Sequence, residues 1–156
     1  MKNVVLMLAT AITLYACQPS EASKQPEKKP EPVFATPPIS ETRQQVNSKA
    51  VATYTTKVKD ELNDWHFTVE AFETAQTFTY KLKITYQEIH ETDTITIPNF
   101  GIEPTVQLKK GPSQYSCIIG FLNKEKQFLP YKQVEAKGEK LKMTTLQHYS
   151  VATYVK

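Results

Sequence analysis

From about Val46 to the C-terminus, apolar and polar residues alternate with a period of two, which is typical of β-strands that bury one face. The longest alternation covers residues 78–87, and a second one covers residues 65–71. Turn-forming residues separate such runs, among them Glu91-Thr92-Asp93 and Lys137-Gly138. No window shows the apolar stripe of an amphipathic helix, so the pattern predicts an all-β chain. Further strands are expected at residues 51–59, 94–97, 105–109, 115–122, 127–134, 140–146 and 149–155.

Seven to nine short strands at this spacing are typical of an antiparallel sandwich or barrel. We predict an antiparallel β-sandwich, Ig-like or transthyretin-like, over residues 46–156. Residues 115–122 are apolar on both faces, which predicts a central strand covered on both sides. Tyr115 lies two residues before Cys117, as in the tyrosine corner of Ig domains, but the partner cysteine of an Ig domain is missing. The similarity is therefore to the sandwich architecture and not to the Ig family.

Residues 1–17 have a different pattern from the rest of the chain. Lys2 is followed by an apolar run that ends at Tyr15. This run is too short to cross a bilayer, which takes about 20 residues. It fits the hydrophobic region of a secretory signal peptide, which we assign to residues 1–16.

The end of this run, Leu14-Tyr15-Ala16-Cys17, resembles the lipobox of bacterial lipoproteins. The resemblance implies that residues 1–16 are removed and that Cys17 becomes a lipidated, palmitate-bearing N-terminus. It also implies a membrane anchor in the cell envelope, and Gln18, which is not an aspartate, implies the outer membrane. The alternative is an ordinary signal peptide cleaved after Ala16, with an unmodified Cys17.

Residues 17–45 contain most of the prolines: six of the ten lie between residues 19 and 38. With few apolar residues, such a segment cannot offset the entropy of ordering and is expected to be a disordered, extended tether. The alternative is a docking motif at Val33-Phe34 or Pro37-Pro38. The only arginine of the chain, Arg43, lies in this segment.

The two cysteines do not predict a disulfide if Cys17 is acylated. Cys117 lies in an apolar stretch and is expected to be a small buried side chain, with an intermolecular disulfide or a reactive thiol as alternatives. Metal ligands usually recur at close spacing, and the best cluster, Glu88 to Asp93 around His90, lacks the spacing of a calcium loop. We therefore expect no metal and no cofactor.

Catalytic and nucleic-acid signals are weak. The sequence has no G-x-S-x-G elbow, and its four glycines provide few of the tight turns that phosphate loops require. From Val46 onward there are 14 lysines, no arginine and 12 acidic residues, a balance that disfavours nucleic acid. We expect a protein that is not an enzyme.

The remaining hypothesis is a binding or structural role in the cell envelope with a protein partner. Aromatic residues are frequent at interfaces, and Phe100, in a Pro/Asn/Gly loop, is the best candidate for an exposed anchor. Tyr86, His90 and Tyr131 complete the predicted interaction surface. The alternatives are a lipoprotein that binds a small ligand or inhibitor, which requires a pocket, and a hydrolase whose catalytic residues lie far apart in sequence.

Overall fold

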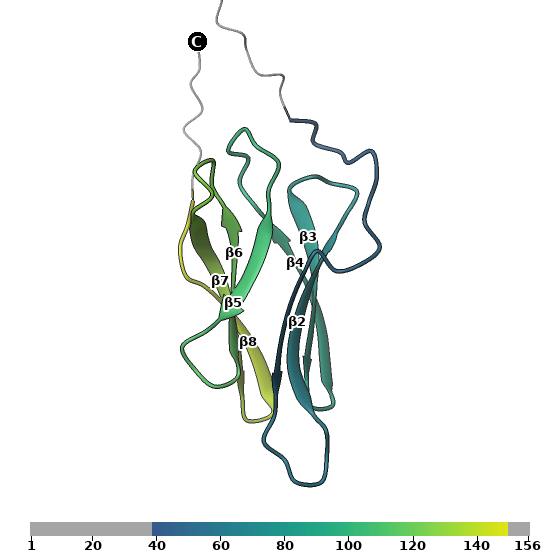
Figure 1. The fold of residues 1–156 in the computed structure, drawn as a ribbon, viewed down its shortest axis with the longest axis vertical. Coiled ribbons are helices and arrows are strands. Elements are labelled where there is room, and N and C mark those ends of the chain that lie inside the picture. The colour runs from purple at the N-terminus through teal and green to yellow at the C-terminus, as the bar shows by residue number, and fades with distance from the viewer. Residues whose placement is uncertain (1–38, 150–156) are drawn as a thin grey trace, which may run out of the picture. The chain divides into compact units, whose positions relative to one another are not determined.

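A computed structural model of the chain describes residues 39–149 (Figure 1). The described residues form eight strands and no helix, which confirms the all-β prediction and the expected number of strands. Accordingly, this part of the chain holds no helix that is long and apolar enough to cross a membrane. The strands are β1 (Ala52–Lys57), β2 (His66–Glu73), β3 (Thr79–Tyr86), β4 (Ile89–Thr96), β5 (Val106–Lys110), β6 (Ser116–Leu122), β7 (Phe128–Lys137) and β8 (Lys140–Thr145).

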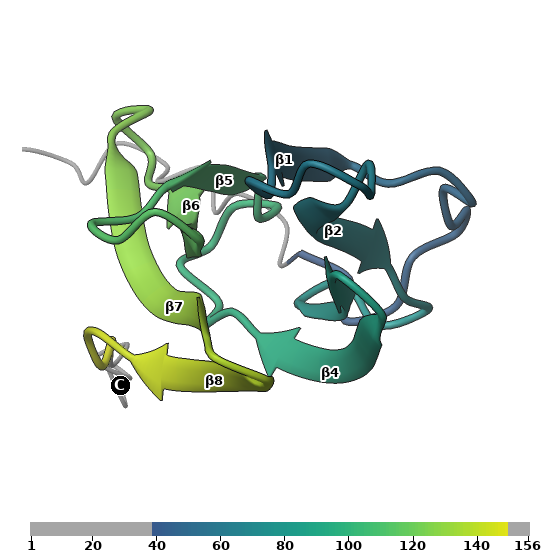
Figure 2. The ribbon, with the colours of Figure 1, turned by 90° about the horizontal axis from the view of Figure 1, so that it is seen from below.

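The strands form two antiparallel sheets of four, each a meander of consecutive strands: β1-β2-β3-β4 and β5-β6-β7-β8. Between β1 and β8 the chain passes from one sheet to the other once, from β4 to β5, and the sheets pack face to face as a sandwich (Figure 2). The β1 and β5 edges approach each other on one side, and the β4 and β8 edges on the other. Ig domains instead exchange strands between their sheets repeatedly, so this connectivity is a simpler arrangement of the same architecture.

The core lies between the sheets and comes from the alternation that the sequence shows. In β3, Tyr80, Leu82, Ile84 and Tyr86 are buried while the lysines between them are exposed. Strand β6 is central in its sheet, as predicted. Its outer face is covered at Gly120 by the ring of Phe128, so closely that an added Cβ would lie 2.5 Å from that ring.

Strand β4 begins earlier than the sequence predicted. Residues 91–93, which the sequence predicted as a turn, lie inside the strand, and the actual turn is Gln87-Glu88, where Gln87 has a φ of 54°. The misleading signal comes from Glu91 and Asp93, which pair across the ladder with the buried Ile84 and Leu82. Their side chains share the core-facing side of the sheet but are exposed, because β4 is an edge strand.

The folded part also begins earlier than the predicted boundary at Val46. Thr42 forms an antiparallel bridge with Gln76, and only 4% of the surface of the Arg43 side chain is exposed. The Arg43 guanidinium donates hydrogen bonds to backbone carbonyls of the β2–β3 connection and lies 4.7 Å from the centre of the Tyr80 ring. Composition indicated a tether here, but this one buried cation binds the segment to the sandwich. The carbonyl acceptors belong to Thr74, Gln76, Thr77 and Thr79.

Candidate functional site

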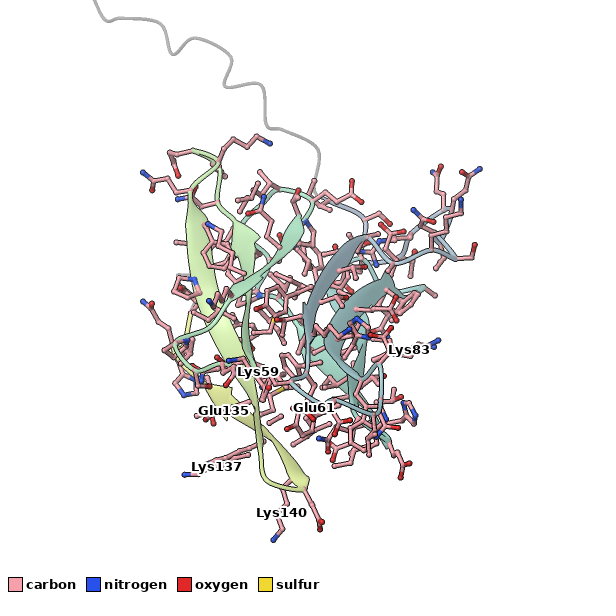
Figure 3. The ribbon with its side chains drawn as sticks, turned by 60° about the horizontal axis from the view of Figure 1, so that its bottom comes forward. Lys59, Glu61, Lys83, Glu135, Lys137 and Lys140 are labelled. Atoms are coloured by element: carbon pink, nitrogen blue, oxygen red, sulfur yellow. The ribbon has the colours of Figure 1, made fainter. Side chains whose placement is uncertain are left out.

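The sandwich has two ends with different loops. The described N-terminal segment lies at one end, together with the β2–β3 and β6–β7 connections (Figure 1). The opposite end, which we call the distal end, carries the β1–β2 loop, the β3–β4 turn, the β5–β6 loop and the β7–β8 turn (Figures 1 and 3). These connections comprise residues 58–65, 87–88, 111–115 and 138–139.

The β1–β2 loop at the distal end is held in a defined shape. Its base is closed by a hydrogen bond from the backbone N–H of Val58 to the carbonyl of Trp65, at 2.8 Å. Inside it, the Asp60 carboxylate accepts the backbone N–H groups of Asn63 at 2.7 Å and Leu62 at 2.9 Å. These hydrogen bonds lower the pKa of Asp60, since they stabilise the ionised carboxylate. The turn around Leu62 is therefore organised by a side chain of the loop itself.

The second sheet also supports this loop. The Tyr115 hydroxyl accepts the backbone N–H of Lys59 at 3.1 Å. The Tyr115 ring lies 5.4 Å from that of Tyr86, which in turn packs edge-on against Phe67 in the core. A line of aromatic rings thus joins the loop to the interior of the sandwich.

Leu62 is the most exposed large hydrophobic residue of the described chain, with 94% of its surface accessible. Single exposed apolar residues are common on protein surfaces and need no explanation by themselves. Leu62 differs because its backbone is held by Asp60, and its loop is fixed to both sheets. A loop held in this way loses little backbone conformational entropy when a partner covers its apolar side chain.

A pocket of about 410 Å³ lies at the same end. It joins the base of the β1–β2 loop to the tips of two hairpins, so three separate parts of the chain form it. Trp65 and Ile89 provide apolar surface, and Glu88 and Glu139 provide carboxylates. The remaining lining residue is Gln87.

The four residues predicted as an interaction surface do not form one site. Phe100 and Tyr131 come together, since both rings pack on Phe121, at centroid distances of 5.6 and 6.1 Å. They are half-buried, Phe100 in the connection between β4 and β5 and Tyr131 in β7. Phe100, expected to be an exposed anchor, therefore serves mainly to cover the core.

Tyr86 and His90 flank the β3–β4 turn at the distal end. Tyr86 is only 7% exposed, and burial raises its pKa. It supports the distal end from inside and offers little surface to a partner. His90 is exposed on the outer face of β4, with Nδ1 3.1 Å from the Thr85 hydroxyl. Strand alternation separates His90 from Glu91, and residues 39–149 contain no cluster of three or more potential metal ligands.

The cysteines fall in different parts of the chain. Cys17, the predicted lipid attachment site, lies outside the described residues, as does most of the expected strand at 149–155. Cys117 is fully buried in β6 and unpaired, as expected for a small core side chain. Burial raises the pKa of its thiol to about 12, which keeps the reactive thiolate form rare at neutral pH.

A larger pocket, of about 500 Å³, lies beside the N-terminal segment. The cation in its lining is Arg43, which already binds groups of the protein itself. The terminal nitrogens of Arg43 donate to backbone carbonyls, and Nε lies 3.7 Å from the Glu73 carboxylate. Glu73 and Glu103 also line the pocket and disfavour an anionic ligand. These contacts indicate that Arg43 attaches the N-terminal segment to the sandwich and does not serve a ligand site.

Sequence reasoning missed the two residues that matter most at the distal end, Leu62 and Trp65. Leu62 had a usable signal, because it is an apolar residue inside the polar stretch Asp60–Asp64, where no strand can bury it. Trp65 was assigned to the core by its place in the alternation. Its role at a pocket depends on the β7–β8 turn, which is 73 or more residues further along the chain.

Comparison of the chain with protein-family models, with curated proteins and with solved structures found no significant match.

Proposed function

We propose that this chain is a lipid-anchored protein of the bacterial envelope whose β-sandwich binds a protein partner through its distal end. The anchor rests on the lipobox-like Leu14–Cys17, and the proline-rich residues that follow act as a tether. Catalysis has no part in this proposal.

The observation that carries the binding role is the presentation of Leu62. A fully exposed leucine on a loop held by Asp60 and Tyr115 offers a partner apolar surface in a fixed place, and burying apolar surface favours association. Burying such a side chain contributes about 1.5–3 kcal/mol. The described chain begins at the opposite end of the sandwich (Figure 1), so a tether attached there leaves the distal end free to meet a partner.

The binding role is tested by photo-crosslinking in cells, with a photoreactive amino acid in place of Glu61. We expect a discrete adduct with an envelope protein, which is lost when Leu62→Ser is added. Val46→Ser is the matched control, since Val46 is an exposed apolar residue of the segment before β1, outside the β1–β2 loop. An adduct that persists with Leu62→Ser, or one that Val46→Ser abolishes equally, contradicts the proposal.

The anchor is tested separately by labelling cells with palmitate. Labelling is expected to disappear in Cys17→Ala and to persist in Cys117→Ala, because Cys117 is buried in the folded domain. Labelling that survives Cys17→Ala would refute the lipid anchor and leave the binding role of Leu62 untouched.

A further inference from the structure

The distal pocket has the composition of a site for a positive charge. Trp65 supplies an aromatic surface, which attracts cations through the quadrupole of its ring. Glu88 and Glu139 come from the tips of two hairpins and place two carboxylates in the lining. Both side chains are exposed and available to a ligand.

The cations of residues 39–149 form no ion pair with these carboxylates. Among the described residues, neither Glu88 nor Glu139 forms an ion pair; the pairs are Arg43 with Glu73 and Lys57 with Asp64. Figure 3 shows Lys137 and Lys140, the neighbours of the β7–β8 turn, extending outward from the hairpin. The two carboxylates of the pocket therefore have no cationic partner among the described residues.

The pocket and Leu62 share the β1–β2 loop, since Trp65 lines the pocket and Leu62 lies in the same loop. Trp65 closes the base of the loop that presents Leu62, through its carbonyl and the Val58 N–H. A protein segment covering Leu62 therefore lies within one loop's length of the pocket. The lining leaves room for a side chain that combines a long apolar stem with a charged head.

We infer that this pocket accepts a lysine or arginine side chain of the partner protein, with its stem on Trp65 and Ile89 and its charge between Glu88 and Glu139. The inference rests on the proposed function, because it assigns the chemistry of the partner that covers Leu62. It makes the distal end a two-part site, with an apolar anchor donated by this chain and a cation donated by the partner.

The test uses Trp65 as its own reporter, since it is the only tryptophan of the chain. The full chain is titrated with the blocked tripeptides Gly-Arg-Gly and Gly-Lys-Gly, with Gly-Gln-Gly as the neutral control, and tryptophan fluorescence is followed. We expect a saturable change with the cationic peptides and none with the neutral one. Equal responses to all three peptides, or no response to any of them, overturn the inference.

The charge requirement is tested with the double variant Glu88→Gln/Glu139→Gln. The affinity for the cationic peptides is expected to fall roughly fivefold or more, as for the loss of favourable surface ion pairs. The matched control is Glu41→Gln/Glu125→Gln, which makes the same change in net charge away from the pocket and leaves the affinity unchanged. Unaltered affinity in the first variant, with an unchanged thermal transition, overturns the inference.

The two proposals fail in different ways. The peptide titration requires no partner, so a negative titration beside a Leu62-dependent adduct removes the pocket's role and leaves the binding role standing. A positive titration without that adduct removes the binding role of Leu62 and leaves the cation site of the pocket standing.

Discussion

The Tyr115 hydroxyl accepts the backbone N–H of Lys59 at 3.1 Å, although the two residues are 56 positions apart in sequence. The bond connects the β5–β6 loop of one sheet to the β1–β2 loop of the other. The loop that carries Leu62 thus depends on the packing of the two sheets and not only on its own turn.

Tyr115→Phe removes this hydrogen bond and keeps the ring that packs on Tyr86. We expect the free energy of unfolding to fall by about 1 kcal/mol, the usual net value of one hydrogen bond. Native-state hydrogen exchange at the Lys59 amide should accelerate more than exchange in the core strands. Gln114→Ala is the control, since it removes the other partner of the same hydroxyl. Equal protection of Lys59 in both variants would contradict the assigned role.

Arg43→Met leaves the backbone carbonyls of Thr74 and Thr77, in the β2–β3 connection, without the guanidinium that donates to them. Because a part-buried acceptor that loses its partner is costly, and two carbonyls lose theirs, we expect a loss of about 2 kcal/mol in the free energy of unfolding. Limited proteolysis should then cut within residues 39–51 before it cuts the strands. Lys49→Met removes an exposed cation from the same segment and should change neither readout. Identical cleavage of the two variants would contradict the role of Arg43 in attaching this segment to the sandwich.

Glu91 and Asp93 are charged residues on the core-facing side of the edge strand β4. Inward-pointing charges on an edge strand disfavour pairing with another chain. Asp93 also accepts the backbone N–H of Thr94 at 2.6 Å. Glu91→Val/Asp93→Val should therefore promote self-association, seen as a larger size in light scattering. Thr92→Val/Thr94→Val, on the outer face of the same strand, is the control. If both variants keep the original size, these charges do not protect the edge.

Cys117 makes the stability depend on pH in the alkaline range. Its pKa is about 12 in the folded state, against an ordinary value of 9.0. Below pH 9 both states hold the thiol proton; above it the unfolded state loses the proton first, so stability falls as pH rises from about 9 toward 12. Cys117→Ala, although less stable overall, should show a flatter decline in urea-unfolding free energy over this range. A decline of unchanged slope would exclude the thiol as a source of the pH dependence.

Much of the fold was predictable because the domain is a sandwich with one buried face per strand. The run at residues 78–87 became β3, with its aromatic and aliphatic residues buried as the alternation required. The prediction was wrong at β4, since Glu91 and Asp93 occupy core-facing positions of the ladder beyond the covered part of the sheet. A local pattern does not reveal whether a strand lies at the edge of a sheet, because strand order is decided by pairing.

The candidate site was less predictable than the fold. Phe100 lies in a loop whose composition suggested an exposed anchor. Its ring instead stacks on Phe121, whose position depends on strands distant in sequence. Leu62 was overlooked because an isolated leucine in a polar turn carries no periodic signal. Its importance follows from the contacts of Asp60 and Tyr115, which hold the turn.

The sequence alone determined the β class, the alternation of the core, the composition of the proline-rich segment and the lipobox-like signal. These properties are local, because they depend on residues next to or near one another in the chain. Only the tertiary structure decided that Arg43 belongs to the folded domain, that Phe100 covers the core, and that Trp65, Glu88 and Glu139 share a pocket. Each of these depends on which strands pair and how the two sheets pack, which brings together residues that no local pattern connects.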